Sequence, residues 1–277
     1  MGRTVWYPGH MAKGKRQLEA LANNLDIIIE VRDARAPYTS SSPLLKLFLP
    51  KIQVMVVLSK ADLANEKTTR DWCLHLKEHG LPTWSLDLRK SGISQLRKAM
   101  LAKKPAFRDL RLAVVGTPNV GKSMLINQFA GRRAAPVGGI PGITKGVSWF
   151  RGDGFMLVDS PGILDPHSDT RVHRFLSWIG SSRGQVIGSW EEHAKECISF
   201  MVKRSLWPSV ESTWNVPVGD TPNETLENIG RRLGKLLPGG VVDMESAGRL
   251  FMDAIATGKY GRMSFEKPDG PSVLESL

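Results

Sequence analysis

The string Gly116-Thr117-Pro118-Asn119-Val120-Gly121-Lys122-Ser123 constrains this chain more than any other feature. It matches GxxxxGK[ST] in full, follows the apolar run Leu112–Val115, and precedes a stretch with a helical pattern. In such a loop the backbone N–H groups surround phosphate oxygens, and the amino end of the helix adds a favourable dipole. The string therefore predicts a phosphate-binding loop. Lys122 is expected to reach the β- and γ-phosphates of a nucleotide, Ser123 to ligate Mg²⁺, and Met124 to lie beside them.

Short apolar runs alternate with helical patterns over the first part of the chain. The apolar runs predict buried strands at 25–31, 53–58, 82–86 and 112–115, and helices are expected at 11–23, 67–79 and 93–102. This alternation predicts a mostly parallel sheet with helices on both faces. The turn Arg151–Gly154, between the runs 148–150 and 155–159, predicts a β-hairpin.

After Asp165 the strand pattern disappears and helical periodicity replaces it. Helices are expected at 191–203, 221–235 and 243–257, with Asp243 as the cap of the last one and Gly258 at its end. The predicted fold is therefore an α/β P-loop domain over residues 1–172, followed by a small all-helical domain over residues 173–277.

Charge is distributed unevenly between these two parts. The chain has 38 Lys and Arg against 27 Asp and Glu, which gives a formal net charge of +11. Residues 1–177 hold 27 basic and 14 acidic residues, whereas residues 178–277 hold 11 and 13. A basic excess of this size predicts a polyanionic partner such as nucleic acid, with solubility alone as the alternative.

Membrane and secreted classes are disfavoured. No apolar stretch approaches the ~20 residues that cross a bilayer, and charged residues interrupt any signal-peptide core in the first thirty residues. The two cysteines, Cys73 and Cys197, have no metal-ligand spacing. We therefore expect a cytoplasmic protein that does not bind membranes.

Two further strings complete a phosphate and metal site. Asp159-Ser160-Pro161-Gly162 ends a predicted strand, so Asp159 is expected to hold Mg²⁺ and the Gly162 amide to meet the γ-phosphate. Thr144, in the stretch Pro141–Thr144, is expected to close over Mg²⁺ when the γ-phosphate is present. An ordinary loop threonine is the alternative.

Base selection is assigned to Ser59-Lys60-Ala61-Asp62, which resembles the NKxD guanine signature. Asp62 would accept hydrogen bonds from the ring N–H and the exocyclic amine of guanine, both of which adenine lacks there. Lys60 would lie along the base plane, and Ser59 stands where Asn is usual. Ser85-Leu86-Asp87 is the candidate for the loop whose backbone N–H binds the guanine oxygen. The predicted cofactor is GTP or GDP with Mg²⁺.

The order of these motifs is inverted relative to ordinary GTPases, because Lys60 precedes Lys122 and Asp159 comes last. This order predicts a circularly permuted GTPase domain. The switch segment after Gly162 then leads directly into the C-terminal helices.

With these motifs, the chain resembles the bacterial ribosome-assembly GTPases of the YlqF/RbgA type. The resemblance includes Trp6–Lys13, Asp33-Ala34-Arg35-Ala36-Pro37 and Gly258–Arg262. It implies GTP hydrolysis during maturation of a large ribosomal subunit (50S) precursor, with the C-terminal helices in contact with rRNA. Ile163 replaces the glutamine that orders water in Ras-like proteins. The resemblance therefore implies that His10 takes part in GTP hydrolysis, with structural packing as the alternative role. Asn119 matches the asparagine that helps to hold K⁺ in K⁺-stimulated GTPases.

The residues assigned to catalysis are His10, Asn119, Lys122 and Thr144, and the protein is expected to be a monomer. Two other hypotheses about function remain open. One is a GTPase in another RNA-related process such as RNA modification, and the other is an RNA-binding module that holds nucleotide passively.

Overall fold

We describe a computed structural model of the chain, in which the described residues are 16, 18–43, 45–49, 51–90, 92–130, 135–137, 149–159, 169–181 and 188–276. The chain divides into two compact units. The first comprises Met1–Asp62 and Thr69–His167, and the second comprises Leu63–Thr68 and Ser168–Leu277. The expected boundary after residue 172 falls inside helix α6 (Thr170–Trp178). The contribution of residues 63–68 to the second unit was not predicted.

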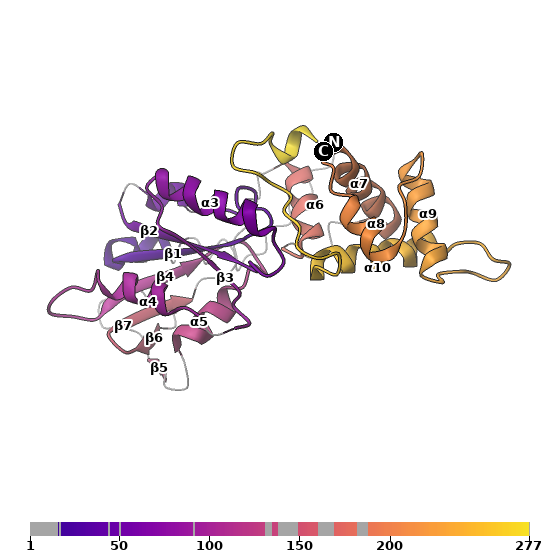
Figure 1. Cartoon of the computed structure of the whole chain (residues 1–277). Helices are drawn as coiled ribbons and strands as arrows, with labels where there is room; N and C mark the ends of the chain where they lie inside the picture. Colours follow the sequence, from indigo (N-terminus) through magenta and orange to yellow (C-terminus); the bar gives the residue numbers. More distant parts are fainter. Residues whose placement is uncertain are drawn as a thin grey trace. The chain divides into compact units, whose positions relative to one another are not determined.

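The first unit contains, among the described residues, a seven-stranded sheet in the order β3-β2-β1-β4-β7-β6-β5 (Figure 1). Neighbours among β1, β2, β3, β4 and β7 pair in parallel, whereas β6 and β5 continue the sheet antiparallel. The strands are β1 Ile27–Asp33, β2 Gln53–Ser59, β3 Thr83–Leu86, β4 Leu110–Val115, β5 Ala135–Val137, β6 Trp149–Gly152 and β7 Phe155–Asp159. The predicted parallel strands and the hairpin β6–β7 are confirmed.

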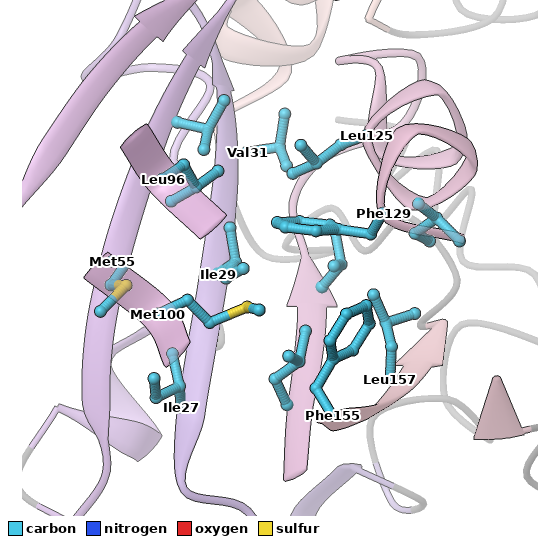
Figure 2. Close-up of a cluster of buried hydrophobic side chains, with 14 of the residues drawn as sticks. Ile27, Ile29, Val31, Met55, Leu96, Met100, Leu125, Phe129, Phe155 and Leu157 are labelled. Carbon is cyan, nitrogen blue, oxygen red and sulfur yellow. The ribbon is translucent and has the colours of Figure 1, made fainter. Parts of the chain in front are cut away.

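Helices cover both faces of this sheet, with α3 (Glu66–Glu78) on one side and α4 (Ser94–Leu101) and α5 (Lys122–Ala130) on the other (Figure 1). A short helix, α2 (Leu45–Phe48), precedes β2. Figure 2 shows how alternate residues of β1 meet the apolar sides of α4 and α5 in one buried cluster. Every residue of β1 is buried, because a parallel strand covered on both faces has no solvent side.

The second unit is helical in the part that the structure describes. Its helices are α6, α7 (Trp190–Lys203), α8 (Pro208–Trp214), α9 (Pro222–Arg232) and α10 (Met244–Thr257). Asp243 caps α10 by accepting a bond from the Ser246 N–H, and Gly258 ends it with a left-handed φ of 74°. Both ends were predicted. Helices α6 and α8 were not, and α9 ends three residues before its predicted limit.

Aromatic side chains form much of the core of this second unit. Phe175, Trp178 and Phe200 lie within 5.7 Å of one another by ring centroids. The segment Leu63–Thr68 joins this unit through backbone contacts, since the Met263 N–H donates to the Leu63 carbonyl at 2.9 Å. No helix in the described part of the chain has the length and apolarity to cross a membrane.

Candidate nucleotide-binding site

The sequence motifs meet at the carboxyl ends of the parallel strands. Asp33, the last residue of β1, is in register with Ser59, the last residue of β2. On the other side of β1, Val114 near the end of β4 is in register with Asp159 at the end of β7. The carboxyl ends of parallel strands are where α/β proteins bind ligands. The fold therefore gathers Ser59, Gly116 and the backbone of Asp159, which belong to the strings predicted to bind base, phosphate and metal and are up to 100 residues apart in the sequence.

The phosphate-binding loop over residues 116–123, called the Walker loop below, connects β4 to α5, as its pattern predicts. A Cβ on Gly116 would lie 2.4 Å from the carbonyl oxygen of Val31, so a side chain does not fit at the first position of the loop. Asn119 has a left-handed φ of 55°. Lys122 is buried, and its Nζ donates to the Thr117 carbonyl within the loop at 2.8 Å. These features give a tight turn with a buried ammonium group, which suits the binding of phosphate.

Ser59 connects the guanine motif to the Walker loop. Its Oγ lies 2.5 Å from the Val120 carbonyl oxygen and 2.9 Å from the Arg32 carbonyl oxygen. A hydroxyl carries one proton, so it donates to one of these two acceptors at a time. The serine that stands where Asn is usual therefore still makes a contact between the two motifs.

The loop after β3 lies against the guanine motif. The Ala61 N–H donates to the Leu86 carbonyl at 3.3 Å, which ties the motif to the predicted Ser85-Leu86-Asp87 loop. Gln128 of α5 also holds this loop by donating to the Leu88 and Lys90 carbonyls. The sequence placed this loop by position alone, and the structure brings it beside residues 59–62.

Arg89 is a charged partner of the guanine motif that the sequence analysis missed. Its guanidinium donates to the carboxylate of Asp62 and, at 3.3 Å, to that of Asp87. Burial raises the pKa of Asp87, but hydrogen bonds from the Arg89 backbone and side chain outweigh burial and hold it below its ordinary value. Arg89 and the guanine edge both offer N–H donors, so they suit the same carboxylate of Asp62.

Asp33 forms a buried ionic cluster beneath Lys60. Its carboxylate accepts from the Arg35 guanidinium at 2.8 Å and pairs with Lys60 Nζ at 2.9 Å. Asp33 and Arg35 are buried, whereas the Lys60 side chain is 24% exposed. Burial alone would raise the pKa of Asp33, but the positive charges of Arg35 and Lys60 hold that pKa well below its usual range. Lys60 has a left-handed φ of 54°, a conformation that needs such support.

The residues predicted to bind Mg²⁺ lie only partly within the described part of the chain. Ser123 is exposed in the first turn of α5, and the backbone of Asp159 ends β7 beside β4. Ser123 carries a hydroxyl and Asp159 a carboxylate, and oxygen groups of these kinds are the ligands that Mg²⁺ prefers. Met124 is also exposed in that turn. His10, Thr144, Gly162 and Ile163 lie outside the described residues.

Comparisons with known proteins agree with this geometry. The family model described as 50S ribosome-binding GTPase matches residues 111–213. Ribosome biogenesis GTPase A of Thermotoga maritima is 36% identical over 267 residues, which covers 95% of this chain and 94% of the relative. The protein of the same name from Bacillus cereus is 32% identical over 280 residues, with coverage of 95% and 94%.

Two solved YlqF structures are also similar to this chain. The GNP-bound YlqF from T. maritima has a TM-score of 0.67 with this chain at 30% identity, and the match covers 94% of this chain and 100% of that one. A GDP-bound YlqF structure gives a TM-score of 0.68 at 30% identity, with coverage of 92% and 100%.

Proposed function

Since the chain belongs to the family of ribosome biogenesis GTPase A, we propose that it binds and hydrolyses GTP on a precursor of the large ribosomal subunit. The observation that carries the proposal is the contact of Ser59 with the Val120 carbonyl. It joins the guanine motif to the phosphate-binding loop, although the two motifs occur in inverted order along the chain. The protein is a GTPase.

Nucleotide binding divides between two parts of the site, one for the base and one for the phosphates. Asp62 accepts the donors of guanine, Lys60 lies along the base, and the loop 85–87 supplies backbone N–H to the guanine oxygen. Residues 117–124 surround the phosphates, with Lys122 balancing their negative charge. Lys60 is held for this task by Asp33, which fixes its ammonium group from below.

Mg²⁺ is assigned to Ser123, Thr144 and Asp159, and when bound it offsets the charge of the phosphate oxygens. Asn119, with its left-handed backbone, is assigned as a ligand of K⁺ in the same loop. His10 is assigned to the ordering of the attacking water, because Ile163 has no polar group for that task. If so, His10→Ala lowers the hydrolysis rate at saturating GTP and spares GTP affinity. Asn119→Ala removes any advantage of K⁺ over Na⁺ at equal ionic strength.

Partner binding is assigned mainly to the basic first unit, which contacts rRNA phosphates, with the helical unit adding contacts. In that helical unit, the two arginines in the last turn of α9, Arg231 and Arg232, already make contacts within the protein. Arg231 pairs with Glu227 at 2.6 Å, and Arg232 donates to the Trp214 carbonyl at 3.1 Å. These bonds leave the larger share of phosphate binding to the first unit. The proposal includes a monomeric protein that acts in the cytoplasm.

The decisive experiment measures GTP hydrolysis with and without large ribosomal subunits, together with co-sedimentation in GTP, GDP and a non-hydrolysable analogue. We expect stimulation by large subunits and tighter binding in the triphosphate state. A rate unchanged by subunits, with no nucleotide-dependent co-sedimentation, contradicts the proposal. That result favours the alternatives, a GTPase of RNA modification or a passive nucleotide-holding module.

A further inference from the structure

The first unit carries a second feature at the amino end of β4, whereas the nucleotide motifs lie at the carboxyl ends of the parallel strands. There the loop between α4 and β4, the amino end of β4 and the hairpin β6–β7 surround a hollow of about 490 Å³. Its lining includes Lys104, Phe107, Arg108, Arg111 and Arg151. We call this surface the Phe107 platform. Its position leaves the nucleotide site accessible when the platform is covered.

Phe107 is unusual because its side chain is fully exposed, with 101% of its reference area open to water. Scattered exposed apolar residues are common and need no explanation by themselves. Here, however, a large aromatic ring stands at the rim of a hollow, between Ala106 and Arg108, and takes no part in the apolar core. A ring in this position offers its π-face to a ligand.

The surroundings of Phe107 are strongly basic. Residues 97–111 contain six Lys or Arg and a single acid, Asp109. The nearby carboxylates are already engaged by arginines. Arg108 binds Asp26 at 2.7 Å, Arg151 binds Asp109 at 3.1 Å, and Arg97 lies 3.6 Å from Asp153.

The lysines of the loop, Lys103 and Lys104, are both exposed, and the structure gives neither an ion pair among the described residues. Since the carboxylates are matched to arginines, these lysines give the platform a surplus of positive charge. A polyanion is the partner that such a surface complements.

We propose that the Phe107 platform binds a single-stranded segment of RNA, with a base stacked on Phe107 and the phosphates beside Lys103 and Lys104. An exposed aromatic ring combined with a basic groove is how proteins bind single strands, because every base has a π-face and every linkage has a charge. In a duplex the bases are already stacked, so Phe107 favours an unpaired segment. The inference rests on the proposed function, since the ribosomal particle supplies the RNA.

The test uses the full-length protein and a fluorescein-labelled single-stranded RNA of about 12 nucleotides, followed by fluorescence anisotropy at several salt concentrations. Phe107→Ala is expected to weaken binding by roughly tenfold, and Phe107→Leu by a similar factor, because leucine has no π-face. Phe107→Trp is expected to retain binding. The double change Lys103→Ala/Lys104→Ala is expected to reduce the salt dependence by a slope of about 1.4, given ~0.7 per phosphate contact on single strands.

Two controls separate the platform from general effects. Leu74→Ala removes another exposed apolar side chain, on α3, and Lys67→Ala/Lys77→Ala removes two exposed lysines of α3. Both controls should bind RNA like the wild type. GDP affinity should be unchanged in every variant, since the platform and the nucleotide motifs lie at opposite ends of the parallel strands.

The proposal is overturned if Phe107→Ala binds the RNA within about twofold of wild type, or if the Leu74→Ala control loses as much. It is also overturned if Phe107→Ala keeps RNA binding and loses only co-sedimentation with subunits, because the platform then contacts a ribosomal protein. Failure of the proposed function looks different. In that case the wild-type protein neither co-sediments with subunits nor is stimulated by them, whatever the platform variants do with free RNA.

Discussion

Replacing Asp33 by Asn tests whether the buried carboxylate beneath Lys60 stabilises the guanine-binding edge. Asparagine has nearly the same shape, so the change removes the charge and keeps the packing. Asp33 accepts from Arg35 at 2.8 Å and pairs with Lys60 at 2.9 Å, and Arg35 is 1% exposed. Breaking one side of a buried pair costs about 3–5 kcal/mol, because the remaining charge stays buried without its partner. Lys60 is partly exposed and can turn to water, so we expect a loss near the lower end, about 3 kcal/mol.

The pH dependence provides an independent check of this magnitude. The pKa of Asp33 is lowered in the folded protein, since the charges of Arg35 and Lys60 outweigh the effect of burial. Its stabilising contribution is therefore complete above the unfolded pKa of about 3.9 and is lost as the pH falls below that value toward the folded pKa. The difference between the wild type and Asp33→Asn should thus be constant from neutral pH to about pH 5. It should then shrink by up to ~1.4 kcal/mol per pH unit below about pH 4.

The assay is urea unfolding with and without GDP. Because the chain has two units, unfolding need not be one transition, and the transition that GDP moves to higher urea belongs to the nucleotide-binding unit. Asp26→Asn is the matched control. It breaks the pair with Arg108, whose side chain is 42% exposed, and should cost less than about 1 kcal/mol. An Asp33→Asn protein that loses no more than this control, or that keeps its full difference from the wild type at acid pH, refutes the reasoning.

Three further changes test other parts of the molecule. Asp62→Asn should shift nucleotide preference from GTP toward XTP, since an amide donates to the extra xanthine carbonyl; in competition binding, unchanged GTP preference would contradict the assignment of Asp62. Gly116→Ala should lower both GDP affinity and the melting temperature, because its Cβ would lie 2.4 Å from the Val31 carbonyl oxygen; wild-type values in both measurements would show that the loop yields without cost. His193 is buried, with its pKa lowered to about 4, first by burial and then by the charge of Arg174. The second unit should therefore lose stability as the pH falls from about 6.5 toward 4. His193→Asn should flatten that slope in urea unfolding, and an equal slope in both proteins would exclude His193 as its cause.

The parallel strands could be predicted because a strand buried on both faces needs a continuous apolar run. The predicted strand 25–31 overlaps β1, which begins two residues later, and the predicted strand 53–58 lies within β2, although Glu30 interrupts the first apolar run. Strand β5 could not be predicted in this way. It has three residues, Ala135–Val137, and includes Pro136, which a sheet tolerates only at its edge. Short elements of this kind are set by their neighbours and carry no periodicity of their own.

The ionic parts of the candidate site were harder to predict than its glycines and its strand ends. Asp33 follows an apolar run, so in sequence it has the pattern of a polar residue at the exit of a strand. Its buried charge is paired with Lys60, which directly follows the neighbouring strand β2 and lies 27 residues further along the chain. Arg89 is a similar case, since its pairing with Asp62 follows from the path of a loop. Pairings of this kind become visible only when the order of the strands is known.

Strand β1 explains why the inverted order of the motifs leaves the site intact. It lies between β2 and β4, so the strands that carry the guanine motif and the Walker loop are two strand spacings apart, about 10 Å at ~4.8 Å per strand. The end of β1 contacts both: the Val31 carbonyl limits Gly116, and the Arg32 carbonyl is an acceptor for Ser59. The site therefore requires that β2, β1 and β4 remain neighbours whose carboxyl ends point the same way. The chain can begin at any connection that preserves this arrangement, and for that reason the order of the motifs and the geometry of the site are independent.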